Sequence, residues 1–272
     1  MKLVKYVAIT ALAVLAVAGL DSCRNRKQDD QKRIELDQLS MIEQKIEENV
    51  YPLPTSADVI KLLTDLDVGY IIGISNPVEN ASKYLTSRNR AVNLGIYGAD
   101  LSYATLYNMQ QEIINYMNSI RMLANELNMS QIYDEKLYND IKVNFDNRDM
   151  LVGILTKAFN DTYSFLSEND QQSLALLMVG GAWVEGMYIT TNISESVYHV
   201  EGIVKVLLEQ KKSFELFIEI ARPYSDDQMV AEFISALEPV RKVYAGLSTS
   251  LSLQDVEAIT LAIEEVREKL VN

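Results

Sequence analysis

Residues 174–184 read Leu-Ala-Leu-Leu-Met-Val-Gly-Gly-Ala-Trp-Val, eleven residues in a row without a charged or strongly polar side chain. A helix that is hydrophobic on every side is buried among other helices. The stretch is too short to cross a membrane, which needs about 20 apolar residues. It continues into Glu185-Gly186-Met187-Tyr188, so an acidic residue directly follows this apolar stretch. The stretch therefore predicts a central core helix.

Helical periodicity covers most of the chain from Thr55 onward. Apolar residues recur every three or four positions at Met109, Ile113, Met117, Ile120, Ala124 and Leu127, as on the buried face of an amphipathic helix. The β-rich run Val68–Ile74 fits a strand or a buried helix equally well. Only 11 glycines and 5 prolines interrupt 272 residues. We predict an all-α fold, an antiparallel multi-helix bundle of about nine helices.

Local signals predict several helix ends. Asn76-Pro77-Val78-Glu79 places a cap residue before a first-turn proline and an acid. Ser252-x-x-Asp255 predicts a capping box, and Ser225-x-x-Gln228 predicts the start of a helix that Pro239 kinks or splits. Further caps are predicted at Ser130 and Asn147.

Two segments of the chain resemble each other. Leu94–Ala99 and Leu177–Ala182 each contain a Gly-Ala pair, and the pairs lie 83 residues apart. Similar short segments precede them at Tyr84–Ser87 and Phe165–Glu168. We predict a duplicated helical hairpin, which would give two similar halves around one core. The alternative is two unrelated buried helices that each contain a Gly-Ala pair.

The first 22 residues have the pattern of a secretory signal peptide. Lys2 and Lys5 precede the apolar run Tyr6–Leu20, and a small residue precedes Cys23, the one cysteine of the chain. A cysteine at this junction resembles the bacterial lipoprotein pattern, in which it is lipidated and becomes the new N-terminus. The alternative is an ordinary secreted protein with a free thiol, because Asp21 stands where that pattern has a small or aliphatic residue.

These signals predict the organisation and location of the chain. Residues 1–22 are predicted to be the signal peptide, residues 23–33 a polar tether that starts at the lipid attachment site, and residues 34–272 a single helical-bundle domain. The protein is then expected in the cell envelope, held at the outer membrane by its N-terminal lipid, on either the periplasmic or the surface face.

Charge and missing residue types exclude several functions. The signal peptide holds two of the 25 basic and one of the 38 acidic residues, so 23 basic and 37 acidic residues remain, a net charge of −14. Such a surface repels phosphates, and no nucleic-acid partner is expected. With His199 as the one histidine and Cys23 as the one cysteine, no histidine- or thiolate-based metal site is expected. The sequence has no phosphate-binding or calcium-binding loop, and no cofactor is predicted.

Two acidic residues within apolar segments are the candidate site residues. A buried carboxylate is costly unless it is paired, so Asp100 and Glu185 are expected to be buried near Tyr or Thr hydroxyls. In a shared cavity they would bind a cation, an amine or a sugar hydroxyl, and at least one is expected to border a pocket with Trp183 or Tyr188. The alternative is that each faces solvent or is merely capped. The predicted ligand-binding residues are Tyr97, Asp100, Tyr107, Trp183, Glu185 and Tyr188.

Four segments, Tyr51–Pro54, Ser75–Asn80, Asn93–Ala104 and Trp183–Gly186, resemble an uncharacterised family of helical lipoproteins from Gram-negative anaerobes. The resemblance implies membrane anchoring and a helical fold. It implies no catalytic residue, because that family has no established activity.

Three functions are open at this point. The 15 tyrosines favour a membrane-anchored module that binds a small ligand or an envelope protein, because tyrosine combines a large contact area with a polar end. The alternatives are a hydrolase that uses Asp100 and Glu185 as an acid–base pair, and a structural component of an envelope complex with a large exposed apolar patch. We predict the binding function, without catalysis.

Overall fold

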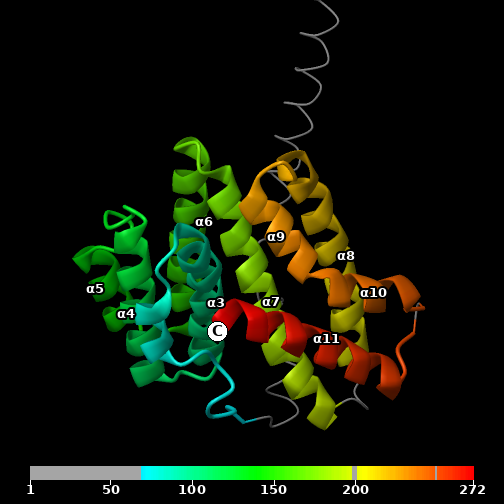
Figure 1. Ribbon diagram of the computed structural model, residues 1–272. Coiled ribbons are helices and arrows are strands. Elements are labelled where there is room, and N and C mark those ends of the chain that lie inside the picture. Colours follow the sequence, from blue (N-terminus) through cyan, green and yellow to red (C-terminus); the bar gives the residue numbers. More distant parts are fainter. Residues whose placement is uncertain (1–68, 198–200, 249) are drawn as a thin grey trace, which may run out of the picture. The chain divides into compact units, whose positions relative to one another are not determined.

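The computed structural model describes residues 69–197, 201–248 and 250–272. The regular elements in these ranges are all helices, which confirms the predicted all-α multi-helix bundle (Figure 1). Two are short 3-10 helices, η1 (Val78–Lys83) and η2 (Arg222–Tyr224). The α-helices are α3 (Ser87–Leu106), α4 (Gln110–Glu126), α5 (Glu135–Val143), α6 (Arg148–Glu168), α7 (Gln172–Val197), α8 (Glu201–Ala221), α9 (Gln228–Ala236), α10 (Glu238–Gly246) and α11 (Leu253–Val271).

Several predicted features lie outside the described residues. They are the signal peptide, the lipid attachment site Cys23, the tether at residues 23–33, the first part of the helical domain up to residue 68, and His199.

The apolar stretch at residues 174–184 lies inside α7, which is the predicted core helix. Leu176, Leu177 and Val184 are at most 2% exposed, and α7 packs against α3, α6, α8, α9 and α11 (Figure 1). By length and composition Gln172–Ile193 could cross a membrane, and 83% of its most apolar window is buried inside the bundle. This degree of burial is typical of a core helix.

Glycines bring α7 into direct backbone contact with α3. A Cβ atom on Gly95 would lie 1.9 Å from the carbonyl oxygen of Met178, and a Cβ atom on Gly181 would lie 2.2 Å from the carbonyl oxygen of Val92. Both distances are far below van der Waals contact, so any side chain larger than hydrogen would force the helices apart. The close crossing of α3 and α7 therefore requires glycine at both positions.

The two central helices run in the same direction. Residues early in α3 contact residues early in α7, and later residues contact later ones. Val92 of α3 lies against Gly181 of α7, and Tyr103 of α3 shares an apolar cluster with Ile189 of α7. Chain neighbours such as α3 and α4, joined by residues 107–109, form the predicted antiparallel hairpins. The central pair differs because α4, α5 and α6 lie between α3 and α7 in the chain and return it to the starting end.

The predicted duplication stays a prediction. Gly95 of α3 lies against Met178 of α7, 83 positions later, which is also the interval between the two Gly-Ala pairs. If α3 and α7 were duplicates packed side by side in the same direction, residues separated by this interval would lie next to each other. The accompanying segments differ in their surroundings, since Tyr84–Ser87 leads into α3 whereas Phe165–Glu168 ends α6.

Three of the predicted helix ends are confirmed. Asn147 caps α6 by accepting a hydrogen bond from the Met150 N–H, and Ser252 forms the predicted capping box with Asp255 at the start of α11. Pro239 splits its predicted helix into α9 and α10, because proline lacks the N–H that a continuous helix needs.

Other predicted ends are wrong in detail. Asp134, not Ser130, caps α5, and the helix predicted after Ser225 begins at Gln228 with Asp227 as its cap. Aspartate is favoured at both ends because its carboxylate accepts helix N–H groups and carries a charge opposite to the N-terminal end of the helix dipole. After Asn76-Pro77 a 3-10 helix begins without a side-chain cap.

Residues 69–77, which we call the strap, are neither strand nor helix. Both structures predicted for Val68–Ile74 are therefore wrong over the described residues. The backbone of the strap binds side chains of distant helices, as the Ile71 N–H does with the Tyr103 hydroxyl at 2.9 Å. Gly73 adopts a φ of +81°, which interrupts any regular repeat. Tertiary hydrogen bonds thus replace those of a regular element.

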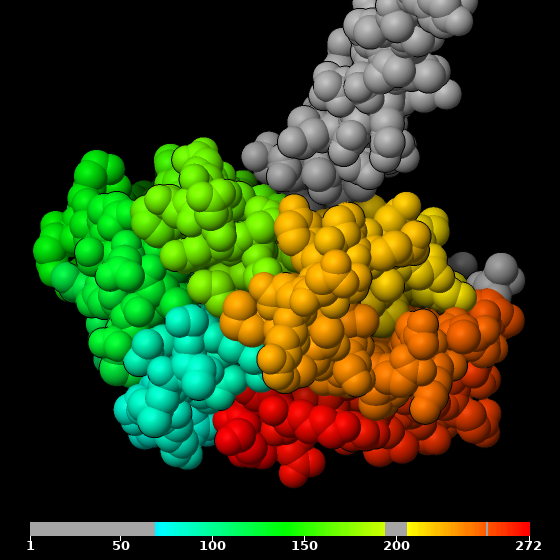
Figure 2. Space-filling model, turned by 45° about the horizontal axis from the view of Figure 1, so that its top comes forward, coloured from blue at the N-terminus to red at the C-terminus, as the bar shows by residue number. Residues whose placement is uncertain are grey.

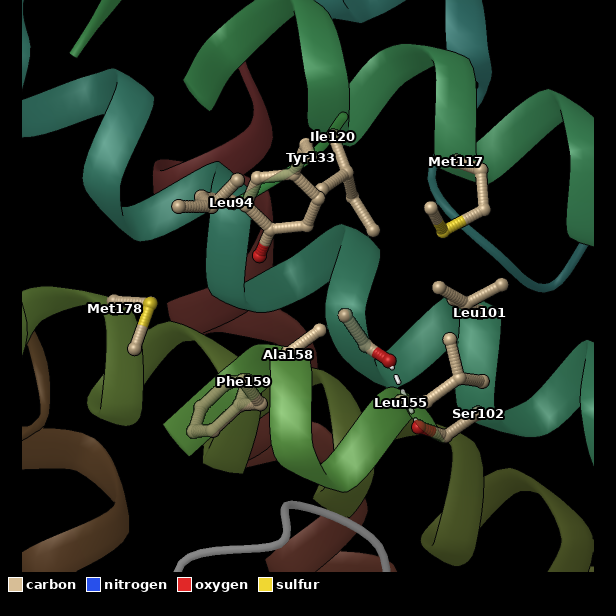
Figure 3. A pocket seen from close by; sticks show the side chains of 11 residues that line it. Leu94, Leu101, Ser102, Met117, Ile120, Tyr133, Leu155, Ala158, Phe159 and Met178 are labelled. Carbon is tan, nitrogen blue, oxygen red and sulfur yellow. Dashed lines mark hydrogen bonds between the residues drawn. The ribbon is translucent and has the colours of Figure 1, made fainter. Parts of the chain in front are cut away.

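A small, mostly apolar hollow lies in the core between α3, α4, α6 and α7 (Figure 3). Its volume of about 20 Å³ has room for one water molecule. The polar groups on its wall already have partners, since the Ser102 hydroxyl donates to the Gly98 carbonyl oxygen at 2.9 Å and the Tyr133 hydroxyl bonds to Thr162. The hollow is therefore a packing gap and not a ligand site.

Two glycines of α3, one turn apart, should respond oppositely to alanine. A Cβ atom on Gly98 would meet the Phe159 ring at an ordinary 3.7 Å, so Gly98→Ala should raise the free energy of unfolding by about 0.5–1 kcal/mol. Gly95→Ala should lower it by about 1–3 kcal/mol or more, because its Cβ would overlap the α7 backbone. Urea denaturation measures both, and stabilisation by Gly95→Ala would contradict the close crossing.

Candidate functional site

The crossing of α3 and α7 brings the two predicted acids together. Asp100 lies five positions after Gly95 on α3, and Glu185 lies four positions after Gly181 on α7. Both side chains have 0% exposure, so the expectation that they are buried is confirmed. Both carboxyl groups lie beside residues 69–77, Asp100 through the Asn76 N–H and Glu185 through Arg267, which binds the Ile74 carbonyl oxygen.

Arg267 of α11 is the partner of Glu185, and the sequence analysis missed it. Its Nε donates to Glu185 Oε2 at 2.6 Å and its Nη2 to Glu185 Oε1 at 2.8 Å, a bidentate pair. The same Nη2 donates to the Ile74 carbonyl oxygen of the strap at 3.2 Å. The guanidinium also lies over the Tyr188 ring, 4.0 Å from its centroid, a cation–π contact. A signal existed, since Arg267 falls four positions after Ile263 on the apolar face of α11.

Asp100 is held mainly by the strap. One oxygen, Oδ2, accepts the Asn76 N–H at 3.2 Å. The other, Oδ1, receives no N–H or O–H donor within the part of the chain that the structure describes, and neither does the nearby Ser75 hydroxyl. Burial raises the pKa of the Asp100 carboxyl well above its usual range, the charge of Glu185 raises it further, and Arg267 opposes the shift. With one proton on Asp100, the two carboxyl groups and the guanidinium have no net charge.

Buried amides extend the cluster to the end of α11. The Asn76 side-chain amide donates to the Tyr84 hydroxyl at 3.0 Å, and Tyr84 donates to the Val271 carbonyl oxygen at 3.1 Å. Asn93 of α3 donates to the Leu270 carbonyl oxygen at 3.0 Å. These bonds satisfy carbonyl groups that the last turn of a helix leaves free. Figure 2 shows the start of the described chain, in cyan, beside this end of α11, in red.

Two further predicted residues adjoin the cluster. Tyr97 is fully buried and donates to the Pro77 carbonyl oxygen at 2.8 Å, which holds the end of the strap. Tyr188 lies under Arg267. The structure therefore brings Tyr97, Asp100, Glu185 and Tyr188 together, around an arginine that was not predicted.

Of the other two predicted residues, Trp183 lies away from the acids and Tyr107 lies at the edge of the cluster. Trp183 donates from Nε1 to Gln210 of α8 at 3.1 Å and packs against Phe214 and Tyr244, so it belongs to the contact of α7 with α8 and α10. Tyr107 packs against Tyr103 at the end of α3, in the apolar cluster against which Tyr188 also packs. Two positions on one helix share a face at spacings of three, four or seven residues, and Trp183 and Glu185 are two apart.

The predicted partners of the acids need correction. The donors are a guanidinium and a backbone N–H, not Tyr or Thr hydroxyls. Thr190 and Thr191 donate instead to carbonyl oxygens one turn earlier in α7, as is usual for these residues within a helix. A guanidinium supplies two parallel donors and a positive charge, which compensate a buried carboxylate better than a hydroxyl does.

A larger hollow lies between α5 and α6, and we call it the α5–α6 groove. Its volume is about 470 Å³. The residues lining it are Gln131, Ile132, Asp134, Lys136, Leu137, Asp140, Ile154, Lys157, Ala158, Asp161, Ser164, Phe165 and Glu168. Neither this groove nor the small core hollow borders Asp100, Glu185, Trp183 or Tyr188. Neither hollow is therefore the pocket that was predicted beside the acids.

No group of three or more His, Cys, Asp or Glu side chains is placed to hold a metal ion among the residues that the structure covers. No family model, curated protein or solved structure matches the chain. The interpretation of the site therefore depends on its own residues.

The buried cluster should make stability depend on pH in a specific way. A group whose pKa is raised on folding stabilises the protein below its unfolded pKa, and this contribution is lost as the pH rises through the folded pKa. Asp100→Asn keeps the shape, supplies an N–H donor toward Glu185 and does not ionise. The difference in unfolding free energy, variant minus wild type, should therefore increase with pH from about pH 4 upward, by at most about 1.4 kcal/mol per pH unit.

Urea denaturation of both proteins at intervals between pH 4 and pH 9 measures this difference. Asp146→Asn, at an exposed position in the α5–α6 connection, is the matched control and should follow the wild-type curve. Parallel curves for Asp100→Asn and wild type would contradict a protonated Asp100.

Proposed function

We propose that this protein is a lipid-anchored envelope protein whose helical domain binds a partner in the α5–α6 groove and catalyses no reaction. One observation carries the proposal. The groove, which is large enough for a ligand, is separate from the two acids that would perform acid–base chemistry. Its volume of about 470 Å³ falls in the range of roughly 300–1,000 Å³ that is typical of ligand sites.

The hydrolase alternative has no comparable support. A pair of catalytic carboxyl groups must face one open cleft, roughly 5–10 Å apart. Asp100 and Glu185 are instead fully buried, and both oxygens of Glu185 accept hydrogen bonds from Arg267. Their arrangement suits a role in holding the strap, α7 and α11 together.

The structural alternative shares the groove with the main proposal. Val143 and Met150, which are 80% and 50% exposed, lie at the end of the α5–α6 hairpin and would add apolar contact area for a permanent neighbour. A structural component and a binding module then differ in the lifetime of the complex and not in the surface used.

The membrane anchor rests on the sequence pattern that ends at Cys23. Cys23→Ser should remove the lipid, so the protein should move from the detergent phase to the aqueous phase in a cloud-point extraction or accumulate as an uncleaved precursor. Acyl chains contribute about 0.8 kcal/mol for each buried CH₂ group, which makes the partition decisive. Wild-type protein in the aqueous phase would refute the anchor.

Photo-crosslinking tests the groove as the binding surface. A benzophenone side chain at Ile154, on the groove wall, should give a discrete crosslinked product when the full chain is produced in its own cells. The same group at Leu261, which is 66% exposed on α11, is the matched control and should give no such product. Equal products from both positions, or none from Ile154, would contradict the proposal.

A further inference from the structure

The chemistry of the α5–α6 groove identifies the class of its occupant. We infer that the groove binds a cationic amphipathic helix, an inference that rests on the binding function proposed above. Three properties of the groove carry it: an apolar floor that continues past the groove, an acidic rim, and walls made of helices.

The apolar floor runs along both helices. On α6, Ile154 and Ala158 line the groove, and Met150, four positions before Ile154, continues the same face. On α5, Leu137 lines the groove, whereas Val143 lies seven positions after Lys136 and shares the face of that lysine and of Asp140. Residues three, four or seven apart share one side of a helix. Met150, which is 50% exposed, thus extends the apolar face of α6 beyond the groove.

The rim of the groove is acidic after its internal ion pairs are counted. Four of its lining residues are Asp or Glu and two are Lys, a net charge of −2. Each lysine is already paired within its own helix, Lys136 with Asp140 and Lys157 with Asp161. Asp134 accepts the Leu137 N–H as the cap of α5, which leaves the charge of Glu168, at one end of the groove, without a lysine partner among the lining residues. Because the whole chain carries a charge of −13, it attracts cations and repels anions over a longer range as well.

The walls favour a helix over an extended peptide. The N–H and C=O groups of α5 and α6 are engaged within these helices, so the groove offers no row of free backbone groups like that of a sheet edge. An extended segment would leave its own backbone groups without partners against apolar side chains. A helix satisfies its backbone internally and presents residues at i, i+3, i+4 and i+7 to such a groove.

Peptide titrations with the purified full chain test the inference. The probe is an 18-residue, fluorescein-labelled peptide with leucines at helical spacing on one face and lysines elsewhere. One twin has glutamate in place of each lysine, and a second has serine in place of each leucine. The cationic amphipathic peptide should bind at least about tenfold more tightly than either twin, and its affinity should fall as salt is raised.

Matched variants locate the binding. Ile154→Ser removes apolar contact, and the double variant Asp161→Asn/Glu168→Gln removes two negative charges. Each should weaken the cationic peptide severalfold, and the double variant should also reduce the salt dependence. The controls are on α11, where Leu261→Ser and the double variant Glu257→Gln/Glu268→Gln make the same changes at exposed positions and should bind like wild type.

Each contrary result overturns the inference in a distinct way. If the α5–α6 variants bind the cationic peptide like wild type, the peptide binds elsewhere on the acidic surface. If the glutamate twin binds as tightly and Ile154→Ser weakens it, the cationic class is wrong while the binding function survives. If no peptide binds, the inference fails, and crosslinking from Ile154 then decides whether the proposed function fails too.

Discussion

The contact between the backbones of α3 and α7 at Gly95 and Gly181 determines most of the structure. With no side chain between the helices, the residues of the next turn, Asp100 and Glu185, are both fully buried. Two adjacent buried carboxyl groups are strongly unfavourable unless a proton and a cation compensate them. The crossing therefore imposes the need for Arg267, which fixes the position of α11.

Arg267 matters because it joins segments that are distant in the chain. Its guanidinium binds Glu185 of α7 and the Ile74 carbonyl oxygen of the strap, and it stacks on Tyr188. A buried ion pair often contributes little net stability compared with apolar residues of the same volume, whereas removal of one partner costs about 3–5 kcal/mol. In this protein the pair selects one arrangement of the strap, α7 and α11 over the alternatives that hydrophobic burial alone would permit.

The features that could be predicted from sequence are those encoded locally. The core helix follows from the unbroken apolar run at 174–184, the start of α11 from Ser252 and Asp255, and the break between α9 and α10 from Pro239. The strap could not be predicted, because its backbone bonds to side chains of α3 and α11 instead of to its neighbours. Arg267 was missed for the same reason, since its partner Glu185 is 82 residues away, and no periodicity encodes which helix faces which.

The buried acids and the α5–α6 groove have different roles in the proposed function. In the core, Asp100 and the Glu185–Arg267 pair bind the strap. The strap connects the described bundle to the residues before 69. Under the proposed anchor, the predicted tether of residues 24–33 would span at most about 36 Å, which would hold the helical domain near the membrane. Its negative charge would repel an anionic bilayer, while a cationic partner would be attracted both to that surface and to the groove. The same charge that excludes nucleic acids thus favours partners that gather at the membrane.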